Sequence, residues 1–254
     1  NKGIKPKVII AVHLYGVPYK IDEIRTIANK YDIPILEDSA EALGSSYKGK
    51  KCGTFGEIGV FSFNGNKIIT TSGGGAIVTQ TKAIKERAVF FATQSRDNAV
   101  HYQHSEIGYN YRLSNICAGI GRGQMEVLDT RVSQRRAMHD FYVDLFAAIP
   151  GITVFTEPNE NYFANYWLSS ILIDPELTNG IDREAVRLTF AAEKIECRPL
   201  WKPMHLQPIF EKYPYYGSNV AENLFKKGLC LPSGSNLTDE DRERISSVIF
   251  ELFS

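Results

Sequence analysis

A lysine stands alone among apolar and small residues in the stretch FSFNGNKIITTSGGGAIVT at positions 61–79. Lys67 is followed by two isoleucines and two threonines, so no acidic residue of this stretch pairs with its ammonium group. One interpretation is a solvated loop lysine, which most lysines are. The other is a partly desolvated amine, which becomes a usable nucleophile toward carbonyl compounds.

A second residue that could take part in chemistry is a carboxylate, which stands at the end of the apolar run IPILED at positions 33–38. Ligands of α/β sheets bind at the carboxyl ends of the strands, so Asp38 could point into a cleft. Its position alone is equally consistent with a helix cap or a turn residue. Glu37 precedes it in the same strand, and its side chain is expected on the opposite face.

Together these residues match the parts that pyridoxal phosphate chemistry requires. A lysine holds the aldehyde, a carboxylate pairs with the protonated pyridine nitrogen, and hydroxyl and N–H groups bind the phosphate. Ser62 could supply a hydroxyl, and Gly73–Gly75 allow backbone conformations closed to other residues. Each signal is weak by itself, and the glycine run is also typical of a tight turn.

The first third of the chain alternates strands and helices. Strands are predicted at 7–12, 33–38, 59–63 and 75–80, and a helix at 20–32. A strand–helix–strand unit of this size implies a parallel pair with a right-handed crossover. We therefore predict an α/β fold with a mostly parallel sheet flanked by helices.

The middle and the end of the chain have a different pattern. We predict a helix at about 81–94, a polar loop at 95–108 and long helical structure at 113–149. Later strands are expected at 152–155 and 166–173, with helices at 182–194 and 238–253; Thr238 and Asp241 form a capping box. This predicts two domains: a large one at 1–150 with a long connecting helix, and a small C-terminal α+β domain at 151–254.

Composition excludes several classes of function. Basic and acidic residues number 29 each, so no overall field attracts nucleic acid or an anionic membrane. The four cysteines lie far apart, which favours reduced cytosolic thiols and no zinc site. His101 and His104 lack partners for a metal site. We expect no membrane span and no signal peptide. The start at Asn1 so close to a strand predicts that upstream residues are missing.

At this point a family resemblance is visible in the residues. The segment IPILEDSAEALGSSYKGKKCGTFGEIGVFSFNGNKIITTSGGGAIV, preceded by HLYG and IDEI, closely resembles the DegT-type nucleotide-sugar aminotransferases. These are pyridoxal phosphate enzymes of fold type I. The segments GYNYRLSNICAGIGRGQ, RPLWKPMHLQPIF and LCLPSGSNLTDED also match, so the resemblance covers nearly the whole chain. Members of this family carry a further N-terminal part that this chain lacks.

The resemblance implies a role for each matching residue. Lys67 matches the Schiff-base lysine, and Asp38 matches the partner of the pyridinium nitrogen. Glu41 falls where the family usually has His or Gln against the ring face. Ser62 matches the phosphate-binding serine. Asn110 matches the asparagine that reaches the phosphate of the neighbouring subunit, which implies a homodimer with a shared active site.

Four further residues are weaker candidates. Arg112 could serve the subunit interface or substrate phosphates. His205 and Trp201 match a segment near the sugar entrance, where packing and substrate contact are equally consistent. His13 follows the first strand and is interpreted as structural.

The resemblance implies an aminotransferase that moves an amino group from glutamate to a nucleotide-linked 4-keto-6-deoxy sugar. The wording NGNKIITTSGGG favours a UDP-linked N-acetylated sugar, with GDP- or dTDP-linked sugars as alternatives. It further implies a cytoplasmic enzyme of cell-surface polysaccharide biosynthesis. Dehydratase relatives replace the lysine with histidine, whereas this chain keeps Lys67. The rival from another class is a non-catalytic binding protein for pyridoxal phosphate or nucleotide sugars. A dinucleotide-dependent dehydrogenase is less consistent, because HLYGVPYK supplies no GxGxxG.

Overall fold

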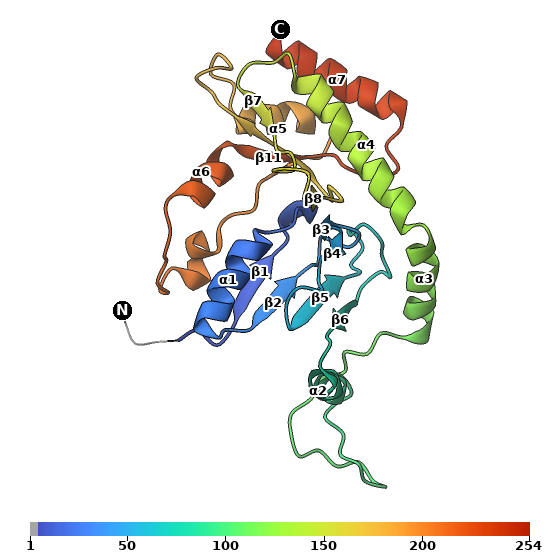
Figure 1. Ribbon diagram of the computed structural model, residues 1–254. Coiled ribbons are helices and arrows are strands. Elements are labelled where there is room, and N and C mark those ends of the chain that lie inside the picture. Colours follow the sequence, from blue (N-terminus) through green and yellow to red (C-terminus); the bar gives the residue numbers. More distant parts are fainter. Residues whose placement is uncertain (1–4) are drawn as a thin grey trace. The chain divides into compact units, whose positions relative to one another are not determined.

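The computed structural model describes residues 5–254, which fall into two compact units (Figure 1). The first unit runs to Ser133 and also includes Glu157–Trp167. The second unit comprises Gln134–Thr156 and Leu168–Ser254. Each unit contains a four-stranded sheet.

The main sheet of the first unit confirms the predicted α/β fold. Its strands lie in the order β1 (Ile9–Val12), β2 (Ile35–Asp38), β5 (Ile58–Ser62) and β6 (Gly75–Val78). The first three are parallel, and β6 is antiparallel to β5. Because parallel strands end at the same edge of a sheet, the last residues of β2 and β5 lie at one edge. The register places Asp38 opposite Val60, two residues before the end of β5.

Helix α1 (Ile21–Tyr31) connects β1 to β2 and packs beside them (Figure 1). Its apolar residues recur at helical spacing, and Ala28 packs in one buried cluster with Ala11 of β1 and Ile35 of β2. The helix ends where Asp32 adopts a left-handed conformation, with a φ of 49°. Pro34 follows, which prevents the helix from continuing. This crossover determines the position of the carboxyl end of β2, where Asp38 lies.

A small second sheet brings a distant segment back to the first unit. It consists of β4 (Lys50–Lys51), β3 (Ser46–Tyr47) and β8 (Tyr162–Phe163). The pairing of β3 with β8 is antiparallel, and the rings of Tyr47 and Tyr162 meet edge to face at 4.9 Å. Residues 157–167 are thereby attached to the loop that follows β2.

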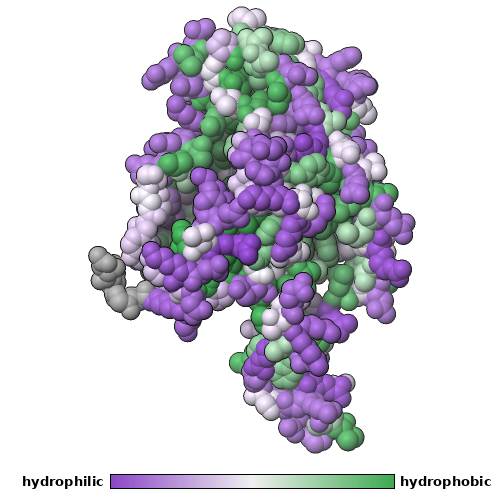
Figure 2. Space-filling view, viewed as in Figure 1, coloured by the Kyte–Doolittle hydropathy of each residue, from purple (hydrophilic) through white to green (hydrophobic). Residues whose placement is uncertain are grey.

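Three helices complete the first unit and lead into the second: α2 (Lys82–Ala92), α3 (Asn115–Glu126) and α4 (Leu128–Phe146). Ser114 caps α3, since its side chain accepts a hydrogen bond from the Cys117 N–H. The helical region predicted at 113–149 is therefore two helices, separated at Val127. The segment 82–110 extends away from the sheet (Figure 1), and apolar patches alternate with polar ones on its surface (Figure 2).

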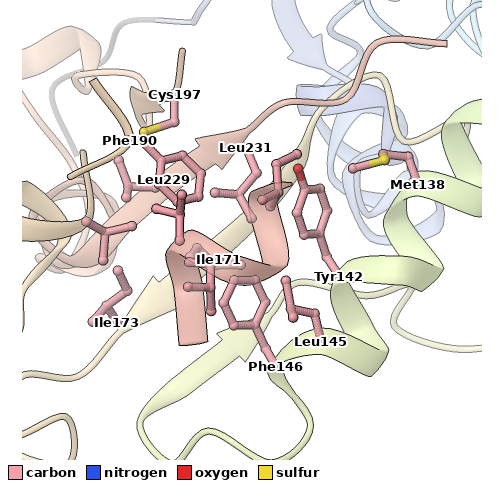
Figure 3. Packing of buried hydrophobic residues seen from close by; sticks show 14 residues of the cluster. Met138, Tyr142, Leu145, Phe146, Ile171, Ile173, Phe190, Cys197, Leu229 and Leu231 are labelled. Atoms are coloured by element: carbon pink, nitrogen blue, oxygen red, sulfur yellow. The ribbon is translucent and has the colours of Figure 1, made fainter. Parts of the chain in front are cut away.

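The second unit is an antiparallel sheet covered by helices. Its strands lie in the order β10 (Arg198–Pro199), β11 (Gly228–Leu231), β9 (Ser169–Ile173) and β7 (Ile152–Val154). The helices are α5 (Arg183–Ala192), α6 (Val220–Lys227) and α7 (Asp239–Phe253), and α7 begins with the predicted capping box. Fourteen buried residues form one core, in which Tyr142 and Phe146 of α4 face the strands (Figure 3).

This core explains why the units do not divide at residue 150, where the sequence analysis places the boundary. Met138, Tyr142, Leu145 and Phe146 of α4 are buried in the core of the second unit. The second unit therefore begins at Gln134, within a helix that the sequence analysis assigns to the first domain. Residues Glu157–Trp167 also belong to the first unit, because β8 pairs with β3. No local sequence pattern indicates this pairing.

Three short 3₁₀ helices, Leu14–Gly16, Met204–Leu206 and Pro208–Phe210, complete the regular structure of the described chain. Of the four cysteines, Cys52, Cys197 and Cys230 are buried and Cys117 is half-buried. Within residues 5–254, none of the helices has the length and apolar character needed to traverse a lipid bilayer.

Candidate active site

Lys67 lies in the loop between β5 and β6 and is largely shielded from solvent. Its side chain is 12% exposed, and the two isoleucines that follow are buried. The ammonium nitrogen lies 3.6 Å from Oε1 of Glu41 and 4.3 Å from the centre of the Trp167 ring. The partly desolvated environment inferred from the sequence is therefore present, and the solvated-loop interpretation does not apply.

Asp38 ends β2 at the same edge of the sheet and is half-buried. Its Oδ1 accepts a hydrogen bond of 3.1 Å from the Ala40 N–H, so the carboxylate stabilises the turn after the strand. Asp38 is therefore a turn residue, which is one of the two interpretations of its position. The same carboxylate can also bind a ligand, because it has two oxygens with several acceptor positions.

Glu41 links these two residues electrostatically. It is 5% exposed, and its Oε2 accepts a hydrogen bond of 2.6 Å from the Tyr15 N–H. Burial raises the pKa of Glu41 to about 7, and the charge of Asp38 adds to this rise. The Tyr15 N–H and the Lys67 ammonium act in the opposite direction. Asp38, Glu41 and Lys67 therefore form one cluster of interacting charges.

Glu37 faces the interior, on the side opposite Asp38, as the strand alternation predicts. It is fully buried, and its Oε2 lies 2.9 Å from Nε2 of His13. The backbone N–H groups of Gly53, Phe55 and Gly56 also donate to this carboxylate. Burial alone raises the pKa of Glu37, but the hydrogen bonds from His13, Gly56 and Gly53 outweigh it and lower the pKa. His13 is fully buried in this network, which agrees with a structural role.

Ser62 ends β5 and pairs with Gly75 of β6. Its hydroxyl accepts a hydrogen bond of 3.3 Å from the Asn64 N–H. Gly75 must be glycine, because a Cβ there would collide with the carbonyl oxygen of Phe61. The hydroxyl therefore lies where β5 ends and the loop that carries Lys67 begins.

Asn110 and Arg112 are exposed and lie elsewhere on the first unit. Asn110 forms an isolated β-bridge with Thr93. Asn110 and Arg112 line a groove of about 1410 Å³ beside β6 and α2. The neighbouring rings of Tyr109 and Tyr111 are stacked, with their centres 4.9 Å apart. The fold of one chain does not join Asn110 and Arg112 to the Lys67 cluster, so their roles stay predictions.

His205 belongs to the second unit, as does Trp201. The imidazole of His205 stacks on Tyr215, with ring centres 3.7 Å apart, and its Nε2 lies 3.0 Å from Oε1 of Glu222. One ring face and one nitrogen are thus engaged within the unit. Trp201 is 48% exposed. Whether either residue contacts a sugar stays a prediction.

Trp167 is a site residue that the sequence pattern does not single out, because it falls within a predicted strand at 166–173. The strand begins only at Ser169, and Trp167 lies before it with its ring over the Lys67 ammonium. No local signal distinguishes this tryptophan from a core residue. Its position depends on the return of residues 157–167 to the first unit, which the sequence does not show.

The cluster has the donor set that pyridoxal phosphate requires. One edge of the sheet presents three groups: the half-buried carboxylate of Asp38 at the end of β2, the hydroxyl of Ser62 at the end of β5, and the shielded amine of Lys67 in the loop that follows. Lys67 would bond to the aldehyde, Asp38 would pair with the pyridine nitrogen, and Ser62 would bind phosphate. Residues 5–254 bring together no group of three or more His, Cys, Asp or Glu side chains that could hold a metal ion.

Comparisons with known proteins show the family of the chain. A model of the DegT/DnrJ/EryC1/StrS aminotransferase family matches residues 3–250. The chain is 49% identical to EpsN of Bacillus subtilis (strain 168), whose name describes a pyridoxal phosphate-dependent aminotransferase. It is 40% identical to the GDP-perosamine synthase of Escherichia coli O157:H7. These matches cover 100% and 98% of this chain but 65% and 66% of the relatives, so the chain spans about two thirds of their length.

The fold has also been seen in solved structures. The aminotransferase TlmJ from Streptoalloteichus hindustanus matches with a TM-score of 0.89 at 24% identity. The match covers 99% of this chain and 67% of TlmJ. This likeness shows that the chain has the type I fold of pyridoxal phosphate enzymes.

Proposed function

Because the chain belongs to the DegT/DnrJ/EryC1/StrS aminotransferase family, we propose that its protein transfers an amino group from glutamate to a nucleotide-linked 4-keto-6-deoxy sugar. Aminotransferases of this family use pyridoxal phosphate. The observation that carries the proposal is the cluster at the sheet edge, where the Lys67 amine lies 3.6 Å from Glu41 and Asp38 adds its charge.

The bound cofactor would supply an aldehyde for the lysine and a ring that accepts electrons from the reacting carbon. Lys67 would first hold the cofactor covalently. Once the amino donor has displaced it, the free amine would move a proton away from the donor α-carbon. In the second half of the reaction, the same amine would move a proton at the sugar carbon that receives the nitrogen.

The other residues would orient and stabilise. The negative charge of Asp38 would keep the pyridine nitrogen protonated, which requires a carboxylate at that end of the ring. Ser62 would bind the phosphate from the end of β5. Glu41 would lie against the ring and exchange protons near neutral pH, in keeping with its raised pKa.

The nucleotide is the finer part of the proposal. The stretch NGNKIITTSGGG favours a UDP-linked N-acetylated sugar, whereas the 40% identity to a GDP-perosamine synthase favours a GDP-linked sugar. We propose both as first substrates, with dTDP-linked sugars next. Nucleotide sugars are cytoplasmic metabolites, so the proposed reaction belongs to the cytoplasm and to polysaccharide biosynthesis. A panel of UDP-, GDP- and dTDP-keto sugars, assayed with the complete protein and glutamate, identifies the nucleotide.

The first experiment replaces Lys67 with alanine in the complete protein. We expect transamination to be lost, because no other amine of the cluster can bond to the cofactor, and the visible absorbance of the lysine–cofactor bond should also disappear. Lys67→Arg is the matched control, since it keeps the positive charge but cannot form the bond. Turnover that persists in the alanine variant would contradict the role of the lysine.

A second experiment tests the alternative of a non-catalytic binding protein. The cofactor-loaded wild-type protein is mixed with glutamate, and the amine form of the cofactor is followed by absorbance. Its formation, with release of 2-oxoglutarate, is expected of an aminotransferase. Stable cofactor absorbance in the presence of glutamate would favour the binding protein.

A further inference from the structure

The indole of Trp167 holds Lys67 from two directions. The ring is 3% exposed, and its centre lies 4.3 Å from the ammonium nitrogen, within the range of a cation–π interaction. The indole Nε1–H donates a hydrogen bond of 2.8 Å to the carbonyl oxygen of Asn66, the residue before the lysine. One side chain therefore contacts both the charged end of Lys67 and the backbone that carries it.

A buried asparagine holds the backbone of Trp167 in turn. Asn165 is fully buried, and its Oδ1 accepts a hydrogen bond of 2.8 Å from the backbone N–H of Trp167. Its Nδ2 donates to the carbonyl oxygens of Glu41 and Leu43, at 2.8 Å each. The segment that presents Trp167 is thus bound to the turn that presents Glu41.

The same asparagine reaches the turn after β1. The Asn165 N–H donates to the Ser45 hydroxyl, which itself donates to the carbonyl oxygen of Gly16. Gly16 has a φ of 92°, and a Cβ there would collide with the Asn165 side chain. The backbone on both sides of the lysine cluster is therefore shaped around Asn165.

We propose that Trp167 is a positioning residue for Lys67, anchored by Asn165, which holds the amine between the indole and Glu41 so that it meets the cofactor aldehyde in one orientation. This inference rests on the proposed function, since it concerns the lysine of that reaction. A long, flexible side chain otherwise samples many rotamers, and misplacement of a reacting group by about 1 Å can cost about a hundredfold in rate.

The test measures how fast cofactor-free complete protein bonds to added pyridoxal phosphate, by stopped-flow absorbance. Trp167→Leu removes the ring face and the N–H, and we expect the bond to form about tenfold more slowly. Trp167→Phe keeps the face, so its rate should stay within about threefold of the wild type. Tyr31→Leu is the matched control, because this ring is exposed at the end of α1 and pairs with another lysine, Lys30, whose ammonium lies 5.4 Å from the ring centre. A wild-type rate in folded Trp167→Leu would overturn the proposal.

A second measurement serves if Trp167→Leu does not fold. Lys67→Met removes the charge facing the indole and should change the tryptophan fluorescence of the cofactor-free protein, whereas Lys30→Met should not. An unchanged spectrum in Lys67→Met would also overturn the proposal. These experiments distinguish failure of this inference from failure of the proposed function. Suppose that the wild-type protein bonds the cofactor at Lys67 but forms no amine form of the cofactor with glutamate. That result would refute transamination and leave the positioning role intact.

Discussion

The Lys67 ammonium has neighbours of two kinds, a carboxylate at 3.6 Å and an aromatic face at 4.3 Å. Neither neighbour is adjacent to Lys67 in the sequence. The carboxylate is itself unusual, because burial holds the pKa of Glu41 at about 7 instead of the ordinary 4.5. Glu41 therefore exchanges its proton near neutral pH.

Glu41 makes the stability of the cofactor-free protein dependent on pH. In the unfolded chain Glu41 ionises near 4.5, whereas in the folded protein it keeps its proton up to about 7. Between these values the folded state binds more protons, so the free energy of unfolding falls as the pH rises and the loss is complete above the folded pKa. Glu41→Gln cannot lose a proton, so wild type should lose about 3 kcal/mol relative to this variant across that window.

Urea unfolding of both proteins from about pH 4 to about pH 8 measures this difference, by the linkage of protons to folding. Other groups titrate in the same range, but they are common to both proteins and cancel in the comparison. A constant difference between the two curves would mean that Glu41 has an ordinary pKa.

Asp38 is predicted to act through its charge. Asp38→Asn keeps the size of the side chain and an oxygen that can accept the Ala40 N–H, so stability should change by less than about 1 kcal/mol. The neutral amide cannot keep the pyridine nitrogen protonated, so transamination should slow by about a hundredfold or more. Single-turnover kinetics with glutamate measure this loss, and a variant with the wild-type rate would remove Asp38 from the cofactor site.

At the scale of elements, the carboxylate of Glu37 joins β2 to its surroundings. It lies opposite Nε2 of His13 and accepts the N–H groups of residues 53, 55 and 56, which form the turn before β5. This one buried group thus fixes the turn after β1 and the entry to β5. The same hydrogen bonds also hold Asp38 in position, because it is the next residue of the strand.

Glu37→Gln should therefore destabilise the protein strongly. The amide group of glutamine cannot accept hydrogen bonds through its nitrogen, so at least one buried N–H would lose its acceptor. We expect a loss of about 3 kcal/mol in the free energy of unfolding. Glu86→Gln is the matched control, since Glu86 is exposed on α2 and forms only a surface pair with Lys82, for which about 0.5 kcal/mol is expected. Similar urea midpoints for both variants would contradict the role of Glu37.

Elements differ in how far the sequence predicts them. Helix α1 and strands β1, β2 and β5 follow from local apolar periodicity and from Pro34, which are properties of the chain alone. Asp38 and Lys67 could be found for the same reason, since each follows a predicted strand. Strand β8 has only two residues, and the residues that it attaches, including Asn165 and Trp167, gain their partners through contacts over 100 positions apart.

At the scale of the whole molecule, a homodimer with shared sites makes a quantitative prediction. Lys67→Ala and Asn110→Ala would each inactivate or impair every site of their own dimer. In a mixed dimer, one site would combine both changes and the other would have neither. Mixing the two variants at equal amounts should thus restore about a quarter of the wild-type activity, since half of the dimers are mixed and half of their sites are intact.

The control mixes Lys67→Ala with an Asp38→Asn variant. Both residues lie in one cluster of the same chain, so a mixed dimer would contain no site with both wild-type residues. No recovery is expected there. Equal recovery in the two mixtures, or none in either, would contradict the predicted role of Asn110 across subunits.

The sequence by itself determined the local features of this protein: the apolar periods of its strands and helices, the capping box of α7, and the lysine and carboxylate that follow two neighbouring strands. These depend on residues within a few positions of one another. Only the tertiary structure decided that the second unit begins within α4, that Glu41 is buried enough to hold its proton near neutral pH, and that an indole lies over Lys67. The physical reason is that burial, desolvation and side-chain contact depend on which distant segments pack together, and the pairing of β3 with β8 is not encoded in any local pattern.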